Sequence, residues 1–167
     1  MARQGKARPR GPTAVSRCAP STDNVRFRRP GNAARPMSEI ELHRKLLGDT
    51  ARNAAFHDAL KALIEPQRST VLDIGAGTGF LSFLARRLGA KQATLIEYSD
   101  ALELAEELAR RNRIDGLSFI KAHSSEVRRK IAVDIVVTET LGNYALEENF
   151  LETAIDARRF LKADGVI

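Results

Sequence analysis

A glycine-rich turn between two different hydrophobic patterns constrains the fold of this chain more than any other feature. The turn, GAGTG at residues 75–79, follows the short apolar run STVLDI at residues 69–74. After the turn, FLSFLARRLG at residues 80–89 has apolar residues at helical spacing and ends on glycine, a typical helix stop. Glycine permits positive φ and lets a ligand approach the backbone closely, so this strand-to-helix turn is a candidate binding site.

Strand and helix patterns alternate along the rest of the chain. Short apolar runs predict further strands at residues 93–97, 117–122 and 132–139, and GVI at the end indicates the start of a fifth strand. Helical spacing is present at residues 39–64, 100–112 and 148–162. This alternation predicts an α/β fold, in which a doubly wound, mostly parallel sheet has helices on both faces. Its ligand crevice is expected at the carboxyl ends of the strands.

Several residues indicate where the helices begin and end. Ser38 and Glu41 have the spacing of a capping box at the start of the first helical stretch. Gly48 is expected to interrupt that stretch, and Pro66 closes it. Ser99 is expected to cap the helix at residues 100–112.

The glycine turn matches neither of two common phosphate-binding patterns. A dinucleotide fingerprint that starts at Gly75 needs glycine at position 80, where the chain has Phe80. No Gly-Lys-Ser/Thr follows, which excludes a phosphate loop of the nucleotide-hydrolase type. Glu97 ends the second predicted strand, and an acid there can accept hydrogen bonds from both ribose hydroxyls. The pattern therefore favours a nucleoside without a pyrophosphate, and the alternative is that Glu97 is a solvated strand end.

The positive charge of the chain is concentrated in its first 36 residues. The whole chain has a formal charge of +6, but residues 1–36 hold nine Lys or Arg and one acid, so the remainder is slightly acidic. This proline-rich stretch is expected to be a disordered basic tail. It either docks weakly on phosphates or an acidic surface, or is an extension without function ahead of Met37. Nucleic-acid binding beyond that weak contact is not expected.

The cysteine count and the hydropathy narrow the class of protein further. Cys18 is the single cysteine, which excludes a disulfide framework and a cysteine-based metal site. No apolar run approaches the roughly 18 residues of a membrane span, so no membrane partner is expected. A cytoplasmic location is the default expectation, although the tail has the Arg-rich, acid-poor composition of organelle transit peptides.

A cluster of acidic residues follows the fourth predicted strand. Residues 138–149 read TETLGNYALEEN and contain Glu139, Glu147 and Glu148. Clustered carboxylates repel one another, so a cation or a proton is expected among them. The alternative, favoured for Glu147, is that these acids stabilise the N-terminus of the next helix.

Residues 71–100, VLDIGAGTGFLSFLARRLGAKQATLIEYSD, resemble the S-adenosylmethionine (SAM) site of class I methyltransferases, which have a Rossmann-like sheet. Within that superfamily the chain is most similar to the N-terminal catalytic half of protein arginine methyltransferases, over about residues 40–167. Composition and the resemblance together divide the chain into the tail, residues 1–36, and a SAM-binding domain, residues 37–167. In the family the fold continues into further strands and a β-barrel, so the domain is expected to be incomplete after the fifth strand.

The resemblance assigns cofactor roles residue by residue. It places Arg52 on the methionine carboxylate, Glu97 on the ribose, and Asp73 with the turn at Gly75 and Gly77 around the methionine part. Three further cofactor contacts are expected from His43, in the helix that covers the cofactor, and from Ser125 and Glu126, near the adenine.

The resemblance also implies an acceptor. The family has two glutamates with eight residues between them in the loop after the fourth strand, and Glu139 and Glu148 match that spacing. Two carboxylates can hold a guanidinium fork and align its nitrogen with the methyl group, which supplies much of the rate. Glu148 or a water is expected to accept the proton. The chain departs from the family at Thr140, Leu141 and Asn143. The resemblance therefore supports arginine as the acceptor less strongly than it supports SAM as the cofactor.

The function expected from the sequence is SAM-dependent methyl transfer to the arginine guanidinium of a protein substrate, without a metal. Two alternatives stay open. One is a methyltransferase for another acceptor, such as a ribosomal-protein amine or a small molecule. The other is an inactive fragment that lacks the substrate-binding barrel. The sequence leaves the oligomeric state open, with a homodimer as one of the states considered.

Overall fold

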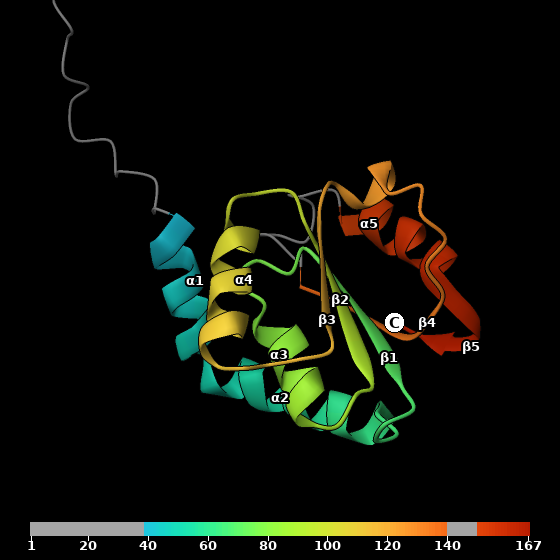
Figure 1. The fold of residues 1–167 in the computed structure, drawn as a ribbon, viewed down its shortest axis with the longest axis horizontal. Helices are drawn as coiled ribbons and strands as arrows, with labels where there is room; N and C mark the ends of the chain where they lie inside the picture. Colours follow the sequence, from blue (N-terminus) through green and yellow to red (C-terminus); the bar gives the residue numbers. More distant parts are fainter. Residues whose placement is uncertain (1–38, 140–149) are drawn as a thin grey trace, which may run out of the picture. The chain divides into compact units, whose positions relative to one another are not determined.

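Five parallel strands form one sheet at the centre of the fold (Figure 1). The computed structural model describes residues 39–139 and 150–167, and the basic tail lies outside them. The strands are β1 Thr70–Ile74, β2 Gln92–Glu97, β3 Leu117–Lys121, β4 Val133–Thr138 and β5 Leu161–Val166. Their order across the sheet is β3-β2-β1-β4-β5, and every neighbouring pair is parallel. The expected α/β fold with a doubly wound parallel sheet is therefore confirmed.

Helices alternate with the strands from β1 to β3 and again between β4 and β5, as the sequence predicts, whereas only a short 3-10 turn lies between β3 and β4. The helices are α1 Glu39–Gly48, α2 Thr50–Leu63, α3 Phe80–Arg87, α4 Ala101–Arg111 and α5 Phe150–Ala157, with short 3-10 turns η1 Ser124–Glu126 and η3 Arg158–Phe160. The predicted break at Gly48 is present, and Asp49 caps α2 by accepting a hydrogen bond from the backbone N–H of Arg52. Ser99 accepts a bond from the backbone N–H of Ala101 at the start of α4. Ser38, the expected cap of α1, lies outside the described residues.

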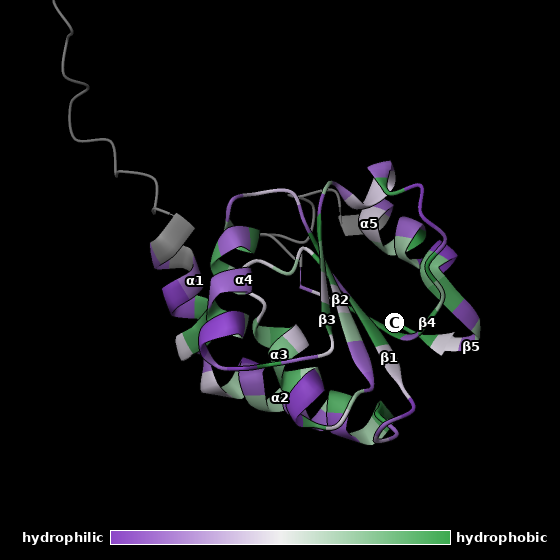
Figure 2. Ribbon diagram, viewed as in Figure 1, coloured by the Kyte–Doolittle hydropathy of each residue, from purple (hydrophilic) through white to green (hydrophobic). Residues whose placement is uncertain are grey.

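Both faces of the sheet carry buried apolar clusters. On one face, Val71 and Ile135 pack with residues of α2 and α3, including Leu60 and Leu81. On the other face, Leu72, Ile96 and Val136 pack with Ala157, the last residue of α5, and with Phe160 of η3. In Figure 2 most of β1 is drawn green, whereas hydrophilic residues in purple gather on α4. Because β1 lies in the middle of the sheet and contributes to both clusters, its carboxyl end is held in a fixed position.

The predicted boundary between the last helix and the last strand is wrong. The sequence predicts a helix to Lys162 and a strand from Gly165, whereas α5 ends at Ala157 and β5 begins at Leu161. Phe160 is 1% exposed in the cluster under the sheet, and Leu161 pairs with Val133 of β4. Burial and strand pairing thus override the helical spacing of this segment.

Two further observations concern the described residues alone. None of their helices is both long enough and apolar enough to cross a membrane. They contain no group of three or more His, Cys, Asp or Glu side chains arranged to hold a metal ion.

Candidate functional site

The register of the central strands places three predicted site residues side by side. Ile74, the last residue of β1, pairs with Ile96 of β2 on one side and with Thr138 of β4 on the other. The residues that follow these three are Gly75, Glu97 and Glu139. The glycine turn therefore leaves the sheet between two glutamates, at the carboxyl edge where the crevice is expected.

The glycine turn is tightly covered by α1. Gly77 has φ +51° and is buried, and an added Cβ would lie 2.7 Å from Cε1 of His43. Gly75 and Gly79 also have positive φ, at 72° and 83°. A side chain at position 77 would strain the backbone and displace His43, so glycine is required for this close approach.

Asp73 fixes the turn to the helix that follows it. Its side chain is almost fully buried, and Oδ2 accepts hydrogen bonds from the backbone N–H and the hydroxyl of Ser82, at 3.1 and 2.8 Å. Because Ser82 lies in the first turn of α3, Asp73 satisfies a backbone donor that has no partner within the helix. Burial raises the pKa of Asp73 to about 7, the bonds from Ser82 oppose this rise, and the nearby charge of Glu97 adds to it.

Glu97 binds the glycine turn from the end of β2. Its Oε2 accepts a hydrogen bond from the backbone N–H of Gly77 at 2.9 Å, and its Oε1 accepts one from the N–H of Ser99 at 2.8 Å. The residue is 6% exposed. Each carboxylate oxygen keeps a further lone pair, so Glu97 can also accept bonds from a pair of hydroxyl groups.

Arg52 and Glu139 form an ion pair between α2 and the end of β4. Nη2 of Arg52 lies 2.9 Å from Oε2 of Glu139, and the two side chains are 17% and 24% exposed. Nη1 of Arg52 donates to the side chain of Asn53, and the guanidinium lies 5.0 Å from the ring centre of Phe56. Nε of Arg52 is buried and has no hydrogen-bond partner among the described residues. The guanidinium thus keeps its buried Nε–H donor available inside the site.

The predicted adenine contacts lie in η1, after β3. The side chain of Ser125 is hydrogen-bonded to Nδ1 of His123 at 2.8 Å. Glu126 accepts a longer bond, 3.4 Å, from the backbone N–H of His123. Both side chains are exposed, and neither makes a hydrogen bond or ion pair with the other predicted site residues within the described part of the chain.

Sequence reasoning missed Tyr98. It directly follows Glu97, is 71% exposed, and its ring centre lies 6.3 Å from that of His123. An aromatic residue next to the acid at a strand end was the available signal, since a flat exposed ring can stack on a nucleobase.

The structure thus brings most of the predicted site residues to one edge of the sheet. Direct contacts link His43 to Gly77, Gly77 to Glu97, and Arg52 to Glu139. The strand register places Gly75 between Glu97 and Glu139, and Asp73 is bonded to the helix that follows the turn. Ser125 and Glu126 follow the neighbouring strand β3. Glu148 lies outside the described residues.

The chain is similar to proteins that methylate other proteins. A family model described as a methyltransferase domain matches residues 66–167. Protein arginine N-methyltransferase 1 of Schizosaccharomyces pombe is 32% identical over 130 residues, which cover 75% of this chain and 38% of the relative. The chain spans between 24% and 38% of the length of the first curated relatives that it matches.

The chain is also similar to solved structures of methyltransferases. The Trypanosoma brucei PRMT1 enzyme–prozyme heterotetrameric complex with AdoHcy is 29% identical with a TM-score of 0.68, and the match covers 77% of this chain and 41% of that one. The ribosomal protein L11 methylase of Lactobacillus delbrueckii subsp. bulgaricus is 28% identical with a TM-score of 0.55, over 67% and 56% of the two chains. The family model matches more than half of this chain, and the matched residues include the glycine turn and all five strands of the sheet. This chain therefore belongs to the methyltransferase domain family.

Proposed function

We propose that this chain binds SAM at the carboxyl edge of β1 and β2 and transfers its methyl group to an arginine guanidinium of a protein substrate. The observation that carries the proposal is the bond between Glu97 and the backbone of Gly77. It joins an acid able to hold a ribose to a turn in which position 77 has no room for a side chain, at one edge of the sheet. The similarity to a complex solved with AdoHcy, the demethylated product of SAM, supports the same cofactor.

The residues present fit the parts of such a cofactor. The free Nε donor of Arg52 suits a carboxylate, because an arginine fork binds carboxylates strongly. Glu97 has acceptor capacity for two ribose hydroxyls, and the exposed ring of Tyr98 offers a face for adenine. When bound, the cofactor supplies a methyl group on a positively charged sulfur.

Glu139 is the residue proposed to hold the acceptor. In the structure it already binds a guanidinium, that of Arg52, at 2.9 Å. A substrate arginine presents the same fork, so Glu139 has the geometry to accept it. With Glu148 as the second carboxylate, Glu139 would fix the attacking nitrogen and localise the positive charge on the rest of the fork. Glu148 or a water would then take the proton that methylation releases.

Residue analysis after methyl transfer tests the acceptor. The chain is incubated with radiolabelled SAM and a mixture of arginine-rich and lysine-rich proteins, and the labelled product is hydrolysed to amino acids. Labelled methylarginine is expected, and Glu139→Gln is expected to abolish it while cofactor binding persists. Recovery of methyl-lysine alone contradicts the arginine proposal.

The similarity to a ribosomal protein methylase supports a second candidate function, methylation of a ribosomal-protein amine. This candidate predicts labelled methyl-lysine or a labelled N-terminal amine in the same assay. A chain that binds cofactor and labels neither acceptor would instead be an inactive binding domain. The oligomeric state, for which we propose a homodimer, is open to sedimentation measurements on the same preparation.

A further inference from the structure

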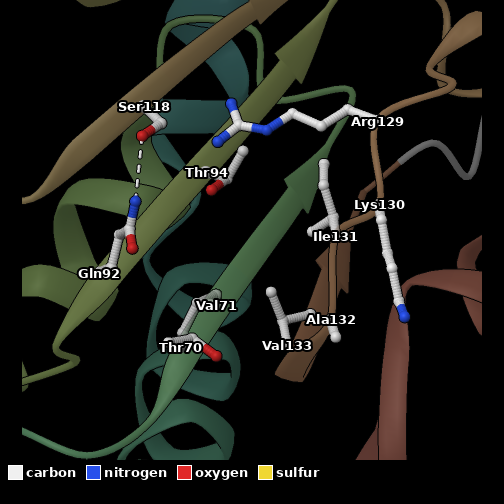
Figure 3. Close-up of a pocket in the computed structure, with 10 residues that line it drawn as sticks. All are labelled: Thr70, Val71, Gln92, Thr94, Ser118, Arg129, Lys130, Ile131, Ala132 and Val133. Carbon is white, nitrogen blue, oxygen red and sulfur yellow. Dashed lines mark hydrogen bonds between the residues drawn. The ribbon is translucent and has the colours of Figure 1, made fainter.

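A pocket lies at the opposite edge of the sheet, where the strands begin (Figure 3). Its volume is about 140 Å³, and Thr70, Gln92 and Val133, which line it, are the first residues of β1, β2 and β4. The other lining residues are Val71, Thr94, Ser118, Arg129, Lys130, Ile131 and Ala132. Glu97 and the glycine turn are at the far ends of the same strands, so this pocket is separate from the proposed methyl-transfer site.

The lining of this pocket offers hydrogen-bond donors and positive charge. It contains two cations and no carboxylate. Gln92 donates a bond to the hydroxyl oxygen of Ser118 at 3.1 Å, which leaves the Ser118 hydroxyl proton free to donate. Within the described part of the chain, the Thr94 hydroxyl makes no hydrogen bond. Thr70 does not supply a free donor to the pocket, because its hydroxyl already donates to Asp134 at 2.7 Å.

Arg129 completes the donor set. In Figure 3 its side chain extends from its loop toward Thr94 and Ser118, whereas the ammonium of Lys130 points away from them. Arg129 forms no ion pair with a described residue, unlike Arg52 and Arg86, whose guanidinium groups are paired. No described acid compensates the charge of this guanidinium, and two hydroxyl donors line the same pocket. An oxyanion can compensate that charge and accept hydrogen bonds from both hydroxyls.

We propose that this pocket binds a small tetrahedral oxyanion of the phosphate class, held by Arg129, Thr94 and Ser118. Its volume decides the size of the ligand, because pockets for cofactor-sized molecules have roughly 300–1,000 Å³. About 140 Å³ corresponds to the space of four or five waters, enough for one phosphate group. The two oxygens of a carboxylate lie in one plane, which the guanidinium fork shares, whereas the oxygens of phosphate point in tetrahedral directions and can meet the fork and both hydroxyls at once. The proposal does not depend on the methyltransferase function.

An NMR titration of the full chain with inorganic phosphate tests this site. Ionic strength is kept constant with sodium chloride, so that general screening does not change. Saturable shifts are expected at the amides of Thr94, Ser118 and Arg129, with a dissociation constant in the millimolar range. Arg129→Gln is expected to weaken binding roughly tenfold, and Thr94→Val roughly threefold.

The matched control is Arg128→Gln. Arg128 is the neighbour of Arg129, is exposed as Arg129 is, and loses the same charge on substitution, but it does not line the pocket. It is expected to change phosphate affinity less than roughly twofold, since an exposed charge that makes no contact acts only through screened solvent. If Arg128→Gln and Arg129→Gln weaken phosphate binding equally, the proposed site is overturned, because the anion is then attracted by the general positive charge of the surface. Shifts that do not saturate, or that map to Gly77 and Glu97, would overturn it as well.

Discussion

At the residue scale, the buried carboxyl group of Asp73 is the most perturbed acid of the site. Its pKa is raised to about 7, mainly because burial penalises the charged form. In the unfolded chain the same group titrates near pH 4. Between these two values the folded state holds a proton that the unfolded state has lost. Asp73 therefore contributes stability at low pH that is lost as the pH rises through about 7.

The substitution Asp73→Asn tests this linkage. Asparagine keeps an oxygen for the bonds from Ser82 and cannot ionise, so the free energy of unfolding should fall less between pH 5 and pH 8 in the variant. The full difference in pKa corresponds to at most about 4 kcal/mol. Urea denaturation across this pH range measures the slope. Parallel curves for the variant and the original chain would show that Asp73 does not titrate there.

Gly77 supports a second prediction at this scale. Alanine at position 77 combines a left-handed backbone with a Cβ 2.7 Å from His43, so Gly77→Ala should destabilise the chain by about 1–3 kcal/mol. The control is Gly48→Ala, because Gly48 has no atom within 4 Å of an added Cβ and no positive φ. It should stabilise the end of α1 slightly, by up to about 1 kcal/mol. Chemical denaturation compares the two variants, and equal effects would contradict the close approach of α1 to the turn.

At the scale of elements, the sequence predicts the positions of the strands well, but it predicts few of the contacts between elements. The four strands from β1 to β4 follow from short apolar runs, because burial on both faces of a parallel sheet requires them. The end of α5 was missed, because helical spacing continues into residues that pair with β4. The ion pair of Arg52 and Glu139 was missed too, since the two residues are 87 positions apart and no periodic pattern relates them.

A double-mutant cycle on Arg52→Gln and Glu139→Gln measures how strongly α2 is coupled to the end of β4. Both side chains are mostly buried, so the coupling in the free energy of unfolding should be about 0.5–3 kcal/mol. The pair of Arg110 and Glu107 within α4 is the control, with side chains 73% and 36% exposed. Its coupling should stay below about 0.5 kcal/mol, as is usual for exposed pairs on a helix. Couplings of equal size would contradict a special role for the buried pair.

At the scale of the whole molecule, the sheet order explains why one edge carries most of the predicted site. Parallel strands end at the same edge, and the register around Ile74 aligns the residues that follow β1, β2 and β4. The sequence predicted this edge from the strand ends alone. It did not predict the pocket at the other edge, because that pocket depends on Arg129 lying near Thr94 and Ser118, and its loop has no periodic pattern. The two edges therefore carry the two binding sites proposed here, which differ in chemistry.

Calorimetric titration with S-adenosylhomocysteine tests the central claim, that Glu97 and the glycine turn hold the methyl-donor cofactor. The full chain should bind this product, and Glu97→Ala should lose roughly a hundredfold in affinity, as the loss of bonds to a buried charged acceptor implies. Glu106→Ala, an exposed acid on α4, is the control and should bind like the original chain. Thermal unfolding checks that both variants are folded. Absence of binding by the original chain, or equal binding by folded Glu97→Ala, would contradict the claim.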